Sequence, residues 1–140
     1  MTRRQLIWAR ILFGVYLLVV AWLCFGKFSS TQNIPWSILG IPSDKLVHFC
    51  MFFPFPILAF LAFDRFTNTV PASLAFGACT LVVGVLLAMG TEWGQATLTD
   101  YRSGDRMDLL ADCIALFLST VLVTVWDIVK QYRPCEKSSS

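Results

Sequence analysis

Polar side chains that can transfer protons or bind ions recur in three short segments of an otherwise apolar chain of 140 residues. Each segment has two of them three or four residues apart, a spacing that places both on one face of a helix. The pairs are Asp44 with His48, Glu92 with Gln95, and Asp108 with Asp112. An imidazole among carboxylates can act as a general acid or base, or can hold a divalent ion. The basic residues Lys45, Arg102 and Arg106 lie close by in the sequence and can bind an anionic group such as phosphate.

The composition is that of a membrane protein rather than of a soluble domain. Hydrophobic residues make up 56% of the chain, charged residues make up 14%, and the mean hydropathy is +0.66. In soluble domains about 25% of residues are charged. The net charge of +2 is small and no run of Lys or Arg stands out, so no nucleic-acid partner is expected. No linker or internal repeat divides the sequence, which predicts a single membrane domain over residues 1–140.

Four apolar runs are long enough to cross a hydrocarbon core of ~30 Å as helices. They cover residues 6–25, 46–63, 72–91 and 109–129, and they predict an all-α, integral membrane four-helix bundle. No A-x-A cleavage motif follows the first run, which favours an uncleaved helix. Pro54 and Pro56 interrupt the second run, and the carbonyls of Cys50 and Phe52 therefore need hydrogen-bond donors other than the helix backbone. Small residues four apart predict close helix packing at Ala75 with Cys79, at Gly90 with Gly94, and at Ala111 with Ala115 and Ser119.

The distribution of Lys and Arg predicts how these spans are oriented. With four spans, the N-terminus, the second loop and the C-terminus lie on one side of the membrane. That side has seven basic residues and the other side has four: Arg3, Arg4, Arg10, Arg65, Lys130, Arg133 and Lys137 against Lys27, Lys45, Arg102 and Arg106. Because basic residues favour the cytoplasmic side, we expect a multi-pass protein of the cytoplasmic (inner) membrane with both termini in the cytoplasm.

Helix geometry places the three polar pairs at a similar depth. At 1.5 Å per residue, Glu92 lies ~31 Å from Pro71, His48 lies ~22 Å from Phe63, and Asp112 lies ~22 Å from Asp127. The pairs are therefore expected to meet near the outer membrane surface and to form one site. His48, Glu92 and Asp108 are its catalytic candidates, and the expected ligand-binding residues are Asp44, Lys45, Gln95, Arg102, Arg106 and Asp112. The other halves of the helices are predicted to be dry, which argues against an ion channel.

Other interpretations of the same residues stay open. The carboxylates, Arg102 and Gln95 can join four short helices through hydrogen bonds without any ligand, as in a non-catalytic scaffold or interaction protein. A metal site is disfavoured by the single histidine and by the lack of HxxxH or ExxH spacing, so no metal and no other cofactor is expected. No nucleophile motif accompanies the acids, and the sequence leaves open whether the protein is an enzyme.

Three motifs in residues 44–116 resemble those of the VanZ-like family of small bacterial membrane proteins. They are Asp44-Lys45-Leu-Val-His48, Glu92-Trp-Gly-Gln95, and Arg102 followed by Asp108 and Asp112. The match departs from the family pattern at Asp112, where the family usually has Asn, and at Ala115 and Leu116, where a glycine is common. The resemblance implies a cell-envelope protein linked, through the family's namesake, to resistance to the glycopeptide antibiotic teicoplanin. It implies no established reaction.

Taken together, the residues and the resemblance predict a pocket that opens toward the outer leaflet. Its expected partner is a membrane lipid or a lipid-linked cell-wall precursor, which the pocket recognises or modifies through the anionic group. In this hypothesis Lys45 and Arg102 hold the anion, and His48 transfers a proton. The alternative is the scaffold protein described above, in which the polar cluster is structural.

Overall fold

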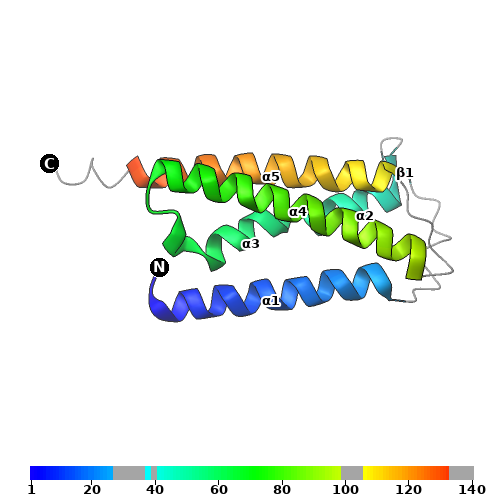
Figure 1. Cartoon of the computed structure of the whole chain (residues 1–140), viewed down its shortest axis with the longest axis horizontal. Coiled ribbons are helices and arrows are strands. Elements are labelled where there is room, and N and C mark those ends of the chain that lie inside the picture. Colours follow the sequence, from blue (N-terminus) through cyan, green and yellow to red (C-terminus); the bar gives the residue numbers. More distant parts are fainter. Residues whose placement is uncertain (27–36, 39–40, 99–105, 133–140) are drawn as a thin grey trace, which may run out of the picture.

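The computed structural model describes residues 1–26, 37–38, 41–98 and 106–132, and of residues 37–38 and 41–44 it describes the backbone alone. The elements, in chain order, are α1 (Arg3–Phe25), β1 (Ser37–Ile38), β2 (Ile41–Pro42), α2 (Ser43–Phe52), α3 (Pro54–Ala62), the 3-10 turn η2 (Asp64–Phe66), α4 (Val70–Leu98) and α5 (Arg106–Tyr132). The strands form a two-residue antiparallel pair. The long helices lie side by side, with α1 and α5 on opposite sides of the bundle (Figure 1).

Four helical segments are long and apolar enough to cross a membrane: Arg3–Phe25, Lys45–Ala62, Val70–Leu98 and Arg106–Tyr132. The predicted all-helical architecture, with four helical segments that could each span a membrane, is therefore confirmed for the described residues, apart from the short strand pair. The helices α1, α4 and α5 extend beyond the predicted apolar runs at one or both ends. In particular, α4 continues to Leu98, so Glu92 and Gln95 lie within a helix rather than at its edge.

The second span is broken, as the prolines predict. α2 ends at Phe52 and α3 begins at Pro54, because the proline ring cannot continue the hydrogen-bond ladder of the preceding helix. Helix α1 supplies donors to the backbone of this broken span. The hydroxyl of Tyr16 donates to the carbonyl of Met51 at 2.6 Å, and Nε of Arg10 donates to the carbonyl of Ala62 at 3.2 Å. These two bonds tie α1 to both halves of the broken span. The predicted need of the Cys50 and Phe52 carbonyls for other donors stays a prediction.

Helices α4 and α5 approach closely at two glycines. A Cβ atom on Gly77 would lie 2.6 Å from Oγ1 of Thr124, and one on Gly84 would lie 2.6 Å from Cδ2 of Leu116. On α5 the predicted packing residues Ala115 and Ser119 are fully buried. On α4 the prediction of Ala75 with Cys79 is wrong, since both are exposed. Of the predicted pair Gly90 and Gly94, nothing lies within 4 Å of a Cβ on Gly90, whereas Gly94 is buried and a Cβ there would lie 2.8 Å from Cε1 of Phe25. The α4 face that packs against its neighbours is instead formed by Ser73, Gly77, Thr80, Gly84 and Ala88.

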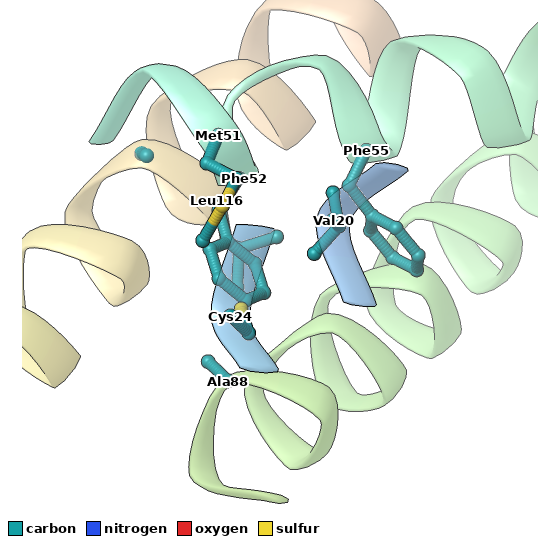
Figure 2. Close-up of a cluster of buried hydrophobic side chains, with 8 residues drawn as sticks. Val20, Cys24, Met51, Phe52, Phe55, Ala88 and Leu116 are labelled. Atoms are coloured by element: carbon teal, nitrogen blue, oxygen red, sulfur yellow. The ribbon is translucent and has the colours of Figure 1, made fainter. Parts of the chain in front are cut away.

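A hydrophobic cluster fills the middle of the bundle (Figure 2). Its buried residues come from all four spans and are Val20, Cys24, Met51, Phe52, Phe55, Ala88, Ala115 and Leu116. Phe52, Ala88 and Leu116 each lie one helical turn from a polar residue of the predicted site: His48, Glu92 and Asp112, respectively. The hydrophobic cluster therefore packs directly next to that site, one helical turn further into the bundle.

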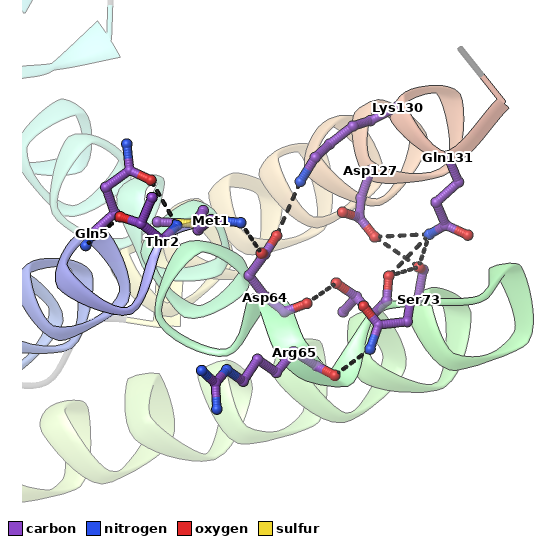
Figure 3. Close-up of polar contacts among 11 residues, drawn as sticks. Met1, Thr2, Gln5, Asp64, Arg65, Ser73, Asp127, Lys130 and Gln131 are labelled. Carbon is purple, nitrogen blue, oxygen red and sulfur yellow. Dashed lines mark hydrogen bonds and ion pairs between the residues drawn. The ribbon is translucent and has the colours of Figure 1, made fainter. Parts of the chain in front are cut away.

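A second polar cluster lies at the opposite end of the bundle (Figure 3). The hydroxyl of Ser73 donates to Oδ2 of Asp127 at 2.7 Å, and Nε2 of Gln131 donates to the same oxygen at 3.2 Å and to Oγ of Ser73 at 2.7 Å. We name these three residues, Ser73, Asp127 and Gln131, the Asp127 cluster. The buried polar side chains of Ser73 and Asp127 contradict the prediction that this half of the bundle has no polar interior. Sequence reasoning missed them because Ser73 and Asp127 are isolated polar residues in apolar runs 54 positions apart.

Candidate functional site

The site is built around His48, which projects from α2 toward α4 and α5. Its imidazole is 2% exposed. Nδ1 lies 3.2 Å from Oδ1 and 3.3 Å from Oδ2 of Asp112, whose side chain is completely buried. Because an ionised carboxylate can only accept hydrogen bonds, we assign the proton of this bond to Nδ1. This assignment leaves Nε2 as the ring nitrogen that faces the carboxylate of Asp108.

Two further carboxylates face the same ring. Oε1 of Glu92, on α4, lies 3.8 Å from Nδ1 of His48, and Oδ2 of Asp108, on α5, lies 3.9 Å from Nε2. The predicted meeting of His48, Glu92 and Asp108 is therefore confirmed. The rise along three helices was enough to predict their common depth, because each helix has the same 1.5 Å step.

Lys45 contributes the positive charge of the site. Lys45 precedes His48 by three residues, a little less than one helical turn. Its Nζ donates to Oδ1 of Asp108 at 2.8 Å. The side chain of Lys45 is 22% exposed, whereas that of Asp108 is 8% exposed. Asp108 also lies in the first turn of α5, where the helix dipole favours a carboxylate. Lys45, His48, Glu92, Asp108 and Asp112 are named the His48 cluster below.

The remaining predicted ligand-binding residues do not all join this cluster in the described structure. Gln95 is buried, and its Nε2 donates at 3.1 Å to the carbonyl of Cys24, which ties α4 to the end of α1. Arg106 is exposed at the start of α5. Asp44 lies in α2, but its side chain is outside the described part, as is the whole of Arg102. Their predicted roles stay predictions.

The electrostatics of the His48 cluster are unusual among helices that are apolar enough to cross a membrane. Three carboxylates and one ammonium group surround one imidazole, and all but Lys45 are buried. Taking a carboxylate out of water costs several kcal/mol unless hydrogen bonds and opposite charges compensate. Such clusters of ionisable residues inside spans usually mark a place where a ligand, an ion or a proton is handled. Chemically, the arrangement can transfer a proton at Nε2, bind an anion at Lys45, or hold a cation between its carboxylates.

Comparison of the chain with protein-family models, with curated proteins and with solved structures found no match. The resemblance to the VanZ-like family therefore stays a prediction from the motifs, and the chemistry has to be argued from the site itself.

Proposed function

We propose that this protein is a multi-pass protein of the bacterial inner membrane that recognises or modifies an anionic, lipid-linked molecule of the cell envelope. The observation that carries the proposal is the buried pair of His48 and Asp112, which lies beside a partly exposed Lys45 at one end of four apolar helices. The VanZ-like motifs support the same assignment. A link to glycopeptide resistance is part of this proposal through the resemblance alone.

Insertion into a membrane is supported by the outward faces of the helices. Large apolar side chains are exposed on every span, including Leu18 on α1, Val47 on α2, Trp93 on α4 and Leu122 on α5. In water these surfaces would associate, whereas in a bilayer they face lipid. Arg3, Arg4 and Arg65 are exposed at the Asp127 end of the bundle. By the positive-inside rule that end is cytoplasmic, and the His48 cluster faces the outer leaflet.

The proposed roles follow from exposure and geometry. Lys45 is the member of the cluster that a ligand can reach, and its ammonium group binds the anionic part of the molecule. His48 is held by Asp112 through Nδ1, so Nε2 is the atom that takes up or delivers a proton. Glu92 and Asp108 set the charge around the ring. The apolar chain of the ligand lies in the lipid outside the bundle and needs no pocket of its own.

Binding of a polyprenyl diphosphate tests the proposal, with the uncharged polyprenol of the same chain length as the matched ligand. We expect the purified protein in nanodiscs to bind the diphosphate about tenfold or more tightly, because a charge-assisted hydrogen bond contributes about 1.5–3 kcal/mol. Lys45→Gln should remove most of this preference. The control is Lys130→Gln, which removes a lysine at the other end that pairs with Asp64. Equal binding of both ligands by the wild-type protein would contradict the proposal.

A structural role for the same residues is the alternative, and the contacts between helices favour it. Lys45 with Asp108 and His48 with Asp112 join α2 to α5, while Gln95 joins α4 to α1. A scaffold predicts that Glu92→Ala and Arg102→Ala lower the melting temperature in detergent without a separate loss of lipid binding or of activity in cells. The proposed function predicts variants that stay folded and heat-stable but lose binding.

A further inference from the structure

We propose that His48, Glu92 and Asp108 together bind a divalent metal ion of the kind that accepts both imidazole nitrogen and carboxylate oxygen, such as Zn²⁺ or Mn²⁺. Each of the three offers one ligand atom, and these atoms lie within 4.8 Å of one another in a buried position. The ligands come from three different helices, α2, α4 and α5. Mixed nitrogen and oxygen ligation suits Zn²⁺ and Mn²⁺ better than it suits Ca²⁺, which prefers oxygen alone.

The hydrogen bonds around the three residues prepare them as ligands. Asp112 accepts the bond from Nδ1 of His48, and this leaves Nε2 free to coordinate, an arrangement that recurs behind metal-bound histidines. Lys45 donates a hydrogen bond to Oδ1 of Asp108. The other oxygen, Oδ2, lies 3.9 Å from Nε2 of His48 and is the one that would bind the ion. Two ligands bonded to one ion at ~2.1 Å can be no more than ~4.2 Å apart. Small rotations of the carboxylate side chains are therefore enough to close the site.

A bound cation also removes a charge repulsion that the proposed function leaves unexplained, and this reason for a metal ion rests on the proposed function. An anionic ligand that approaches Lys45 also approaches Glu92, Asp108 and Asp112, and the three carboxylates repel it. A divalent ion held by carboxylates attracts phosphate oxygens and bridges the two, as it does in many phosphate-binding sites. With the ion bound, Nε2 of His48 coordinates the ion. It then no longer transfers the proton that the proposed function assigns to it.

Metal binding by the full-length protein in detergent tests the inference. The protein is stripped with a chelator, dialysed against Mn²⁺ or Zn²⁺ alone, and analysed for bound metal. We expect one ion per chain, with an imidazole nitrogen in the X-ray absorption spectrum. Glu92→Gln and Asp108→Asn should each weaken binding about tenfold or more. Asp112→Asn, which removes a charge behind His48 without removing a ligand, should weaken it by about 10–100-fold. The control is Asp127→Asn, which removes a buried carboxylate at the opposite end and should bind as the wild type does.

Two results would overturn the metal site: no stoichiometric ion in the wild-type protein, or an equal loss of binding in Asp127→Asn and Glu92→Gln. Circular dichroism and gel filtration check that each variant is folded, and if Asp108→Asn is not, Glu92→Gln and His48→Gln decide the question. The diphosphate lipid separates this inference from the proposed function. Lipid binding that persists in chelator, in a protein that takes up no stoichiometric ion, overturns the metal site and leaves the proposed function standing. Stoichiometric metal without any preference for the diphosphate supports the metal site and contradicts the proposed function.

Discussion

Asp112 of α5 accepts a hydrogen bond from Nδ1 of His48 of α2, at 3.2 Å, inside the bundle. The two residues are 64 positions apart in the sequence, and both are almost completely buried. The bond fixes the orientation of the only imidazole in the chain and determines which ring nitrogen is available to a proton, an ion or a ligand.

The first prediction separates the hydrogen bond of this pair from its charge. Asp112→Ala leaves the buried Nδ1–H of His48 without its acceptor, and we expect a loss of about 1–3 kcal/mol in the free energy of unfolding. Asp112→Asn keeps an acceptor oxygen in the same place and should lose clearly less. Denaturant unfolding in detergent, followed by circular dichroism, measures both. Equal losses in the two variants would show that the charge, rather than the acceptor, holds the pair together.

The second prediction concerns Gln95, which the sequence assigns to ligand binding and whose amide donates to the carbonyl of Cys24. Gln95→Leu removes that donor and leaves the carbonyl of Cys24 in a buried place, so we expect a loss of about 1–3 kcal/mol in stability. Metal binding and lipid binding, measured as above, should stay within twofold of the wild type. A loss of ligand binding without a loss of stability would show that Gln95 takes part in ligand binding, as the sequence predicts.

The third prediction tests the close approach of α4 and α5. Gly77→Ala places a Cβ 2.6 Å from Oγ1 of Thr124, a short side chain with little freedom to move away, and should cost about 1–3 kcal/mol. The matched control is Gly90→Ala on the same helix, where nothing lies within 4 Å of the new Cβ. There the better helix propensity of Ala should leave stability unchanged or raise it by up to about 1 kcal/mol. Thr124→Ala in the Gly77→Ala background should restore part of the loss.

The helices and the depth of the site could be predicted from the sequence for a simple physical reason. A bilayer requires long apolar runs, and a helix converts residue number into height at a constant rate, so His48, Glu92 and Asp108 could be placed at a similar level. Helix ends were less predictable. Hydropathy falls at Glu92, but the backbone hydrogen bonds of α4 continue to Leu98.

The exact partner of each side chain on a neighbouring helix could not be predicted, because periodicity gives the face of one helix and not the rotation of its neighbours. Spacing alone does not say that His48 bonds Asp112 or that Gln95 reaches the backbone of Cys24. The same limit explains the wrong choice of Ala75 and Cys79, since α4 has more than one stripe of small residues and the sequence does not say which stripe faces α5. It also explains why the Asp127 cluster was missed.

The last prediction is a pH dependence at the Asp127 end, outside the spans. Burial raises the pKa of the Asp64 carboxyl, but its hydrogen bond and charge interaction with Lys130, and those with the amino group of Met1, outweigh this effect, so the pKa lies below its usual value of 3.8. Because the folded-state pKa is lowered, the ion pairs stabilise the protein above the unfolded-state pKa, and this stabilisation is lost as the pH falls through the lower folded-state value.

Lys130 is 49% exposed, so solvent screens its ion pair with Asp64, and we expect the pair to contribute less than about 1 kcal/mol. Unfolding measured between neutral pH and pH 3 should therefore show a smaller acid-induced loss for Lys130→Gln than for the wild type, and added salt should reduce the difference. An unchanged acid profile in Lys130→Gln would mean that the pair does not form in solution.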